Sequence, residues 1–353
     1  MTRILLASIS ILKVKNNTFL FYFVALYIGQ ASGPVFFNLN FKGSCNMAKF
    51  QIKSLADLIA KLNSGRIRGL IVWQGASIVD GAQIALVCNR FASNGQNEKT
   101  GGDMVQSWIL PDPAAAGILV QGSRPAQIMA YLKATGAKSI CGDCKHAWQF
   151  NPITGEHEKG SCYVMESRAP AAVLGSMARG SYPVAGIDFP AAWISEIFKG
   201  RKFRGGAYGD PAAIPARVWA NILRKTAMHT GYTHFWKSLN PAARANAEKL
   251  MPVFMASCDS TVDLYTARFL GWRGFMVAPQ SKGLPDLAPF GGPAVAMHCP
   301  ASKQFEKAHG RKTNCQSCGA CAGITGPKGG QRAVVIPAHG YAVKNLRPNV
   351  AAA

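Results

Sequence analysis

Seven of the ten cysteines in this 353-residue chain fall into two groups whose spacing suits metal ligation. The first group is Cys141, Cys144 and Cys162, and the second is Cys299, Cys315, Cys318 and Cys321. A C-x2-C pair lets two thiolates grip one ion from a tight turn. Cysteines bunched in this way, in a chain too long to be a small disulfide scaffold, indicate metal ligation in a reducing compartment. The two groups therefore predict two metal sites.

The second group offers a complete set of four thiolates. Its C-x2-C-x2-C run resembles iron–sulfur ligation, in which loop thiolates wrap a cubane. Four thiolates suit structural zinc equally well, because both metals favour sulfur ligands. Buried free thiols and a redox dithiol at one pair are the other interpretations. The cofactor that we expect is an iron–sulfur cluster or zinc.

The first group is one ligand short of a tetrahedral site. Candidates for the fourth ligand are His146, His157 and Cys258, a water or a substrate. An open fourth position would admit a substrate to the metal, which is the arrangement of a catalytic site. A protein ligand in that position would instead close the site and make it structural.

Polar or sulfur residues follow successive strand-like runs at steps of 24, 24, 22 and 19 residues. They are Asp210, His234, Cys258, Gln280 and Cys299. Such steps are close to one βα unit each, and the strand ends of a barrel or open parallel sheet gather on the face that carries the chemistry. We therefore expect Asp210 and His234 to be catalytic. The alternatives are that Asp210 caps the following helix and that His234 is a hydrogen-bonded structural histidine.

These residues require an α/β scaffold. We expect a βα-repeat domain, a partial or complete barrel, with a small N-terminal α+β region and two cysteine-rich metal knots. The expected parts are a leader or upstream extension at 1–46, the α+β region at 47–136, the first cysteine knot at 137–170, the βα-repeat region at 171–298, and the second knot with the C-terminal tail at 299–353.

Local patterns predict the individual elements. Ser54 and Asp57 stand at N-cap and N3 spacing before an apolar stripe, which predicts a helix that ends at Asn63. Alternating and β-branched runs predict strands at 69–73, 77–79, 82–88 and 105–110. Further helices are expected at 125–134, 191–198, 215–225 and 242–251.

The charge of the chain is strongly basic, with 39 Lys and Arg against 17 Asp and Glu. Such an excess favours nucleic acid as a partner, with an anionic membrane surface second. The first 46 residues contain no acid and an apolar run, Phe19–Ile28, that is too short to span a bilayer in the ordinary way. This leader is interpreted as translated upstream sequence before a start at Met47, as a secretory signal or as an anchor. Because the cysteines point to a reducing compartment, we expect the cytoplasm of a host cell rather than export, with no membrane partner for the body of the chain.

Several strings taken together resemble an uncharacterised family encoded by bacteriophages and plasmids, over about Phe50 to Gly340. The strings are Lys99-Thr100-Gly101 with Met104 to Leu110, Cys141-Gly142-Asp143-Cys144 with Cys162-Tyr163-Val164, Gly206 to Pro211, Thr230 to His234, and the Cys315 triplet ahead of Ala338-His339-Gly340. The C-x2-C…C-Tyr pattern followed by βα units is more distantly similar to phage proteins regarded as radical-SAM-like. The C-x3-C-x2-C spacing of most radical S-adenosylmethionine enzymes is absent. The resemblance implies a mobile-element protein and brings no established activity.

Two functions follow from these features. The first is a metalloprotein enzyme with an iron–sulfur cluster, which predicts a concave pocket at the strand ends with Asp210 and a metal inside it. The second is a zinc-stabilised, basic, nucleic-acid-binding or replication-associated protein. That function predicts closed four-ligand sites and a continuous Lys/Arg face.

Overall fold

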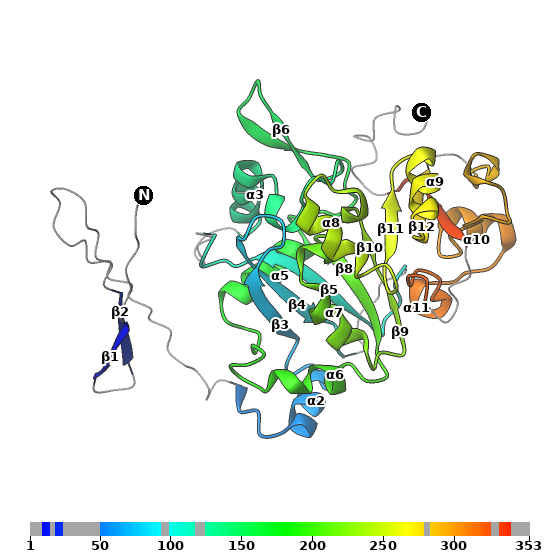
Figure 1. The fold of residues 1–353 in the computed structure, drawn as a ribbon. Helices are drawn as coiled ribbons and strands as arrows, with labels where there is room; N and C mark the ends of the chain where they lie inside the picture. Colours follow the sequence, from blue (N-terminus) through cyan, green and yellow to red (C-terminus); the bar gives the residue numbers. More distant parts are fainter. Residues whose placement is uncertain are drawn as a thin grey trace. The chain divides into compact units, whose positions relative to one another are not determined.

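The computed structural model describes residues 9–14, 18–23, 50–92, 99–116, 124–278, 283–325 and 332–339. Contacts divide the chain into two compact units, residues 1–51 and residues 52–353. In the first unit, strands β1 (Ile9–Val14) and β2 (Thr18–Phe23) pair as an antiparallel hairpin. The remainder of the expected leader lies outside the described residues. The site lies in the second unit, most of whose helices and strands are labelled in Figure 1.

The second unit is a mixed α/β structure that contains two five-stranded sheets. In the first sheet, three antiparallel strands are continued by two parallel ones in the order β3-β4-β5-β8-β9. The strands are β3 (Gly69–Ala76), β4 (Gln83–Asn89), β5 (Met104–Pro111), β8 (Lys202–Tyr208) and β9 (Met228–Thr230). Most positions of β4 and all of β5 are buried, which explains their nearly continuous apolar sequence.

The second sheet is parallel throughout, in the order β10-β11-β12-β14-β13. Its strands are β10 (Tyr232–Thr233), β11 (Met255–Cys258), β12 (Gly274–Ala278), β13 (Ala296–His298) and β14 (Ala333–Pro337). Parallel pairing requires a crossover between neighbouring strands, and helix α9 (Thr261–Phe269) supplies the one between β11 and β12 and packs on both. The carboxyl ends of these strands therefore share one edge.

Gly231 joins the two sheets, because β9 ends just before it and β10 begins just after it. Its N–H donates to the Cys321 carbonyl (3.1 Å), and its carbonyl accepts from the Met255 N–H (3.0 Å). A Cβ at this position would lie 2.3 Å from Cδ1 of Phe254, so only glycine fits. The junction therefore also holds the loop that carries Cys321.

Among the remaining elements, those at 55–63, 124–135, 191–197, 216–223 and 241–248 overlap helices that the sequence predicts, and the sequence analysis made no prediction for the others. The remaining elements are helices α2 (Leu55–Asn63), α3 (Arg124–Thr135), α4 (Lys138–Cys141), α5 (Ala169–Ala178), α6 (Ile194–Ile197), α7 (Ala216–Leu223), α8 (Pro241–Glu248), α10 (Lys303–His309) and α11 (Cys315–Cys318), the short 3-10 helices η1 (Ala191–Trp193), η2 (Pro211–Ala213), η3 (Phe235–Lys237) and η4 (Ala288–Phe290), and the hairpin strands β6 (Trp148–Asn151) and β7 (Glu156–Lys159).

The predicted cap of α2 is confirmed, because the Ser54 side chain accepts from the Asp57 N–H at 3.1 Å. The predicted strand at 77–79 is wrong. Strand β3 ends at Ala76, and the following residues form a turn in which the Ser77 N–H donates to the Ala82 carbonyl (2.8 Å). No helix in the described part of the chain is long and apolar enough to cross a bilayer.

An aromatic core lies beneath the turn that follows β8. Trp219 on α7 is fully buried and contacts Phe203 and Phe254 through tilted and edge-on ring packing. Its indole N–H donates to the Pro211 carbonyl at 2.8 Å. The core therefore fixes the backbone immediately after Asp210, where the first strand-end residue was expected.

Candidate functional site

All seven cysteines of the two groups line a single cavity of about 230 Å³. Asp210 and His234 also face this cavity, and these two residues, like Cys299, each lie just after the end of a strand. The structure therefore brings together three of the five strand-end residues that the spacing singled out. The two groups, which lie far apart in the sequence, belong to one site.

The C-x2-C loop of the first group is tied to the neighbouring chain. Cys141 ends α4, and the Cys144 N–H donates back to the Cys141 carbonyl at 3.2 Å. Between them, Asp143 accepts hydrogen bonds from the Ser238 hydroxyl (3.0 Å) and the Leu239 N–H (2.8 Å). The loop is thereby fastened to the turn that precedes α8.

The β6–β7 hairpin returns Cys162 to this loop across the intervening residues. At its base the Gly160 N–H donates to the Ala147 carbonyl (3.1 Å), and the Cys162 N–H donates to the His146 carbonyl (2.8 Å). Cys162 is thus held by a backbone hydrogen bond to His146, which lies two residues after Cys144. The long gap in the sequence is closed by a hairpin.

The second group is assembled from β13 and the segment before β14. The Cys299 N–H donates to the Val335 carbonyl (2.8 Å). Cys315 and Cys318 form the single turn α11, and the Cys315 N–H donates to the Lys99 carbonyl (2.8 Å). The second group is therefore built onto the loop before β5 as well as onto its own segment.

Arg273 holds the backbone of the loop that carries Cys321. It is 3% exposed and donates to the carbonyls of Ala320 and Ala322, the latter at 3.0 Å, and to that of Arg332 at 2.8 Å. Charge-assisted hydrogen bonds of this kind are about twice as strong as neutral ones. Arg273 therefore fixes the backbone on both sides of Cys321.

Burial raises the pKa of five thiols that face the cavity, those of Cys141, Cys162, Cys299, Cys315 and Cys321. The pKa of Cys162 and that of Cys299 rise to about 11, and those of Cys141 and Cys321 rise further above the ordinary value. The negative charges of neighbouring cysteines add to this effect within each group. Reactive thiols have a lowered pKa, so this environment opposes the redox-dithiol interpretation. A metal that binds here must displace protons from these thiols.

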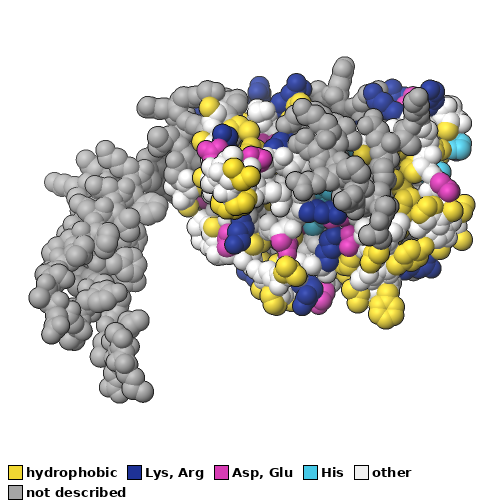
Figure 2. All heavy atoms as spheres, turned by 90° about the horizontal axis from the view of Figure 1, so that it is seen from above, with side chains coloured by type: hydrophobic (Ala, Val, Ile, Leu, Met, Phe, Trp, Pro, Cys, Tyr) yellow, Lys and Arg dark blue, Asp and Glu magenta, His cyan; other side chains and the backbone are white. Residues whose placement is uncertain are grey.

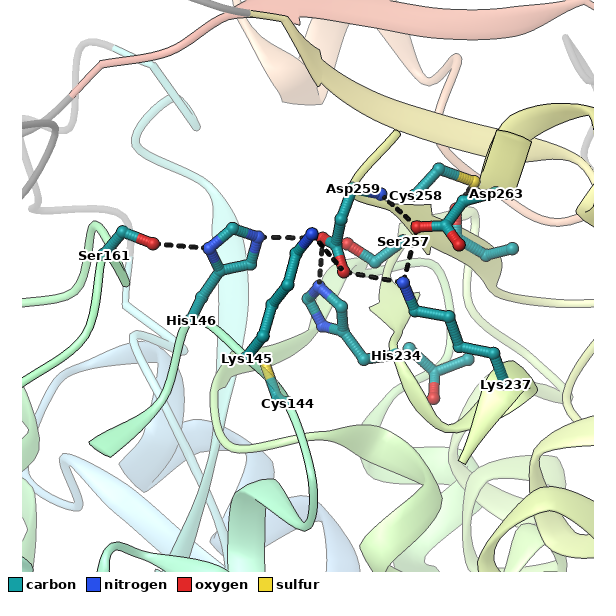
Figure 3. Close-up of polar contacts among 12 residues, drawn as sticks. Cys144, Lys145, His146, Ser161, His234, Lys237, Ser257, Cys258, Asp259 and Asp263 are labelled. Atoms are coloured by element: carbon teal, nitrogen blue, oxygen red, sulfur yellow. Dashed lines mark hydrogen bonds and ion pairs between the residues drawn. The ribbon is translucent and has the colours of Figure 1, made fainter. Parts of the chain in front are cut away.

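A second kind of ligand set, made of nitrogen and oxygen, lies in the same cavity. Figure 3 shows His146 and His234 pointing at Asp259. Asp259 Oδ1 lies 2.8 Å from His146 Nε2 and 3.3 Å from His234 Nε2, and Asp259 Oδ2 lies 2.7 Å from Lys237 Nζ. The two histidines and Asp259 bring three ligand atoms within 4.8 Å of one another. We name these three residues the His/Asp cluster.

The charges of the His/Asp cluster act on one another. Burial lowers the pKa of His234, but the charges of Cys144 and Asp259, both hydrogen-bonded to the ring, outweigh it and raise that pKa well above its ordinary value. Burial raises the pKa of Asp259, but the charge of His234 and the hydrogen bond from His146 hold it well below its ordinary value. The His234 ring and the Asp259 carboxylate therefore stabilise each other's charged forms.

Asp210 positions His234. Its carboxylate accepts from the Thr233 hydroxyl (2.6 Å), the His234 N–H (2.6 Å) and the Ala212 N–H (2.9 Å), and its own N–H donates to the Ile140 carbonyl (2.7 Å). The capping interpretation is thus confirmed, since Asp210 is the N-cap of η2. The same side chain fixes the backbone that carries His234.

Two candidates for the fourth ligand have other contacts. The ring of His157 forms a hydrogen bond with the Lys133 carbonyl (2.9 Å), and His157 does not line the cavity. The thiol of Cys258 is buried in the core and donates to the Ala256 carbonyl at 3.5 Å. The remaining protein candidate, His146, belongs to the His/Asp cluster. Gln280 lies outside the described residues.

Sequence reasoning missed Asp259, Tyr208 and Glu166, which all line the cavity. Side chains alternate along a strand, so Ser257 and Asp259 face the cavity while Cys258 points into the core. The available signal was the lone carboxylate one residue beyond the chosen Cys258. The hydroxyl of Tyr208 is buried and has no hydrogen-bond partner among the described residues.

The described residues form no single basic stripe on the face drawn in Figure 2. Lys and Arg side chains lie there in separate small groups with acidic and neutral side chains between them.

The nine cysteines within the described segments are free thiols.

Comparisons of the chain with protein-family models, with curated proteins and with solved structures found no match.

Proposed function

We propose that this chain is a metalloenzyme in which two cysteine-ligated iron–sulfur centres lie at the edge of one substrate cavity. The observation that carries the proposal is that both cysteine groups, the His/Asp cluster and Tyr208 line the same cavity, the Tyr208 hydroxyl having no hydrogen-bond partner among the described residues. Perturbed titratable groups that converge in a cavity are the usual mark of an active site. A pair of purely structural metal sites has no need to share such a space.

Iron–sulfur ligation is favoured over zinc by the spread of the thiols. Thiolates on one tetrahedral zinc lie about 3.8 Å apart, given Zn–S bonds of about 2.3 Å. Among the described residues, which include all seven cysteines, the set of three ligand atoms within 4.8 Å is the His/Asp cluster and not a set of thiols. A cubane spreads its thiolates over several iron atoms and accepts the wider arrangement.

We assign different roles to the residues around the cavity. An iron–sulfur centre supplies one-electron transfer when it is bound. Lys99 and Arg204 lie beside the second group and supply positive charge to offset its thiolates. His234, which Asp210 positions, faces the cavity and is available for catalysis there. The hydroxyl of Tyr208 is available as a donor or acceptor for a substrate polar group.

The finer assignments belong to the same proposal. We take the parallel strands from β8 onward as a βα-repeat, barrel-like region and the two cysteine segments as metal knots. The resemblance to a family encoded by phages and plasmids supports a mobile-element origin, and the free thiols support the reducing cytoplasm of a host cell.

The test is anaerobic purification of the full chain followed by iron, zinc and acid-labile sulfide analysis and an absorption spectrum. We expect a brown protein that contains iron and sulfide. Cys162→Ala and Cys318→Ala, made separately, should each remove one centre. Cys88→Ala is the control, because Cys88 is buried in β4 outside both groups and should leave the metal content unchanged. Metal content that is unaltered in both of the first two variants would show that the ligand assignments are wrong.

The alternative is a zinc-stabilised nucleic-acid-binding protein, which has the net charge of +22 in its favour. It predicts a colourless protein with two zinc ions. It also predicts affinity for DNA or RNA that falls steeply with salt and survives substitution of His234. That combination would replace the enzyme hypothesis.

A further inference from the structure

The His/Asp cluster has the composition and spacing of a metal site that contains no sulfur. His146 lies in the first cysteine segment, His234 follows β10 and Asp259 follows β11, so three separate parts of the second unit deliver one ligand each. Metal–ligand bonds of about 2.0–2.2 Å place neighbouring nitrogen and oxygen ligands about 3 Å apart. The observed separations are 2.8 and 3.3 Å from Asp259 Oδ1 to the two Nε2 atoms.

Two of the three ligands, His146 and Asp259, are held by a further hydrogen bond on the other side. His146 Nδ1 lies 2.5 Å from the Ser161 hydroxyl, which leaves Nε2 directed at the cluster. Asp259 Oδ2 accepts from Lys237, which leaves Oδ1 for the two histidines, and Lys237 is itself fixed by Asp263 at 2.5 Å. Metal ligands in proteins are oriented by outer hydrogen bonds of this kind.

The burial of the cluster suits an ion that reacts with a substrate. The Asp259 side chain is 2% exposed, whereas those of His146 and His234 are 16% and 21% exposed. The cluster is therefore closed on the carboxylate side and open on the side where the histidines line the cavity. Three protein ligands leave further coordination positions free, as catalytic sites do.

We propose that His146 Nε2, His234 Nε2 and Asp259 Oδ1 bind one divalent transition-metal ion in the cavity between the two cysteine groups. Two imidazoles and one carboxylate suit Fe²⁺, Mn²⁺ or Zn²⁺ and form the ligand set of many non-haem iron sites. This site is a third metal site, and it does not depend on which metal the cysteines hold.

The test uses Mn²⁺ as the probe, because carboxylate and imidazole ligands accept it while thiolates select softer metals. Purified full-length protein is titrated with Mn²⁺, and the free ion is followed by electron paramagnetic resonance. We expect one Mn²⁺ per chain, with electron spin-echo modulation from imidazole nitrogen. His146→Gln and Asp259→Asn should abolish this binding, and Ser161→Ala should weaken it about 10- to 100-fold.

His157→Gln is the matched control, because His157 lies in the same segment but outside the cavity, and it should bind Mn²⁺ as the wild type does. Iron and sulfide are measured on the same samples, so failure of this site and failure of the cysteine centres are told apart. A wild-type protein without bound Mn²⁺, or with bound Mn²⁺ that lacks nitrogen modulation, would overturn the proposal. The same holds if His146→Gln loses iron but keeps Mn²⁺, since His146 would then be the fourth ligand of the first cysteine group.

Discussion

Replacement of Gly142 by alanine tests whether the C-x2-C turn depends on its backbone shape. Gly142 lies between Cys141 and Cys144 at φ 56° and ψ −131°, a region that residues with a side chain rarely adopt. An added Cβ would lie 2.6 Å from two ring carbons of Phe235, which is fully buried. The substitution therefore combines backbone strain with an overpacked core.

The expected destabilisation follows from these two terms. A residue forced into a sparsely populated backbone region costs about 1–3 kcal/mol. Overpacking of a filled core costs about 1–3 kcal/mol more. Gly142→Ala should therefore lower the free energy of unfolding by roughly 2–6 kcal/mol, measured by urea denaturation. Because the two cysteines flank the strained residue, the variant should also lose the metal of the first group.

Gly155→Ala is the matched control for backbone strain alone. Gly155 lies in the turn of the β6–β7 hairpin at φ 69°, and a Cβ there would meet no atom within 4 Å. This variant should lose only about 1–2 kcal/mol and keep its metal. If Gly142→Ala is no less stable than Gly155→Ala, the contact with Phe235 does not constrain the turn and the reasoning is refuted.

Three further predictions concern other parts of the second unit. Burial lowers the pKa of His229 below its unfolded value, so the folded state favours the neutral ring. The contribution of His229 to stability therefore falls as pH drops below about 6.5. The stability advantage of the wild type over His229→Gln should shrink between pH 7 and pH 5 in urea titrations, and a constant difference would contradict this. Tyr208→Phe removes a buried hydroxyl without a partner among the described residues, so it should leave the protein equally stable or stabilise it by about 1 kcal/mol, and a loss above about 1 kcal/mol in thermal melts would reveal a hidden hydrogen bond. Arg273→Lys breaks the paired contacts to the carbonyls beside Cys321, so it should lower stability by roughly 2–4 kcal/mol and release metal from the second group in a chelator assay, and retention of both properties would show that the Cys321 loop holds itself.

Local sequence was sufficient wherever the physical cause is local. The capping residue Ser54 and the apolar stripe behind it predicted α2, because a helix begins with a side-chain oxygen that accepts from its first turn. The runs that precede Asp210 and Cys299 predicted strands that end near those residues. The prediction of a strand at 77–79 is wrong because Ser77 closes a turn instead. The strand propensity of these residues does not distinguish a short strand from a turn.

The choice of Cys258 over Asp259 shows where spacing alone misleads. A one-residue difference on a strand reverses the face that a side chain occupies, and the register of β11 against β10 and β12 decides which face is the core. That register is a property of the assembled sheet. The sequence interval marked the correct strand end but not the correct residue.

The sequence by itself determined the chemistry that this chain offers. Thiolates three residues apart, and a histidine and an aspartate at strand ends, follow from residue types and local order alone. Only the tertiary structure decided which of them meet. His146 and Asp259 are 113 residues apart in the chain, yet they are 2.8 Å apart in space, and the two cysteine groups share one cavity. The physical reason is that parallel strands and the β6–β7 hairpin bring distant segments together, and this pairing is set by the packing of the whole core rather than by any single segment.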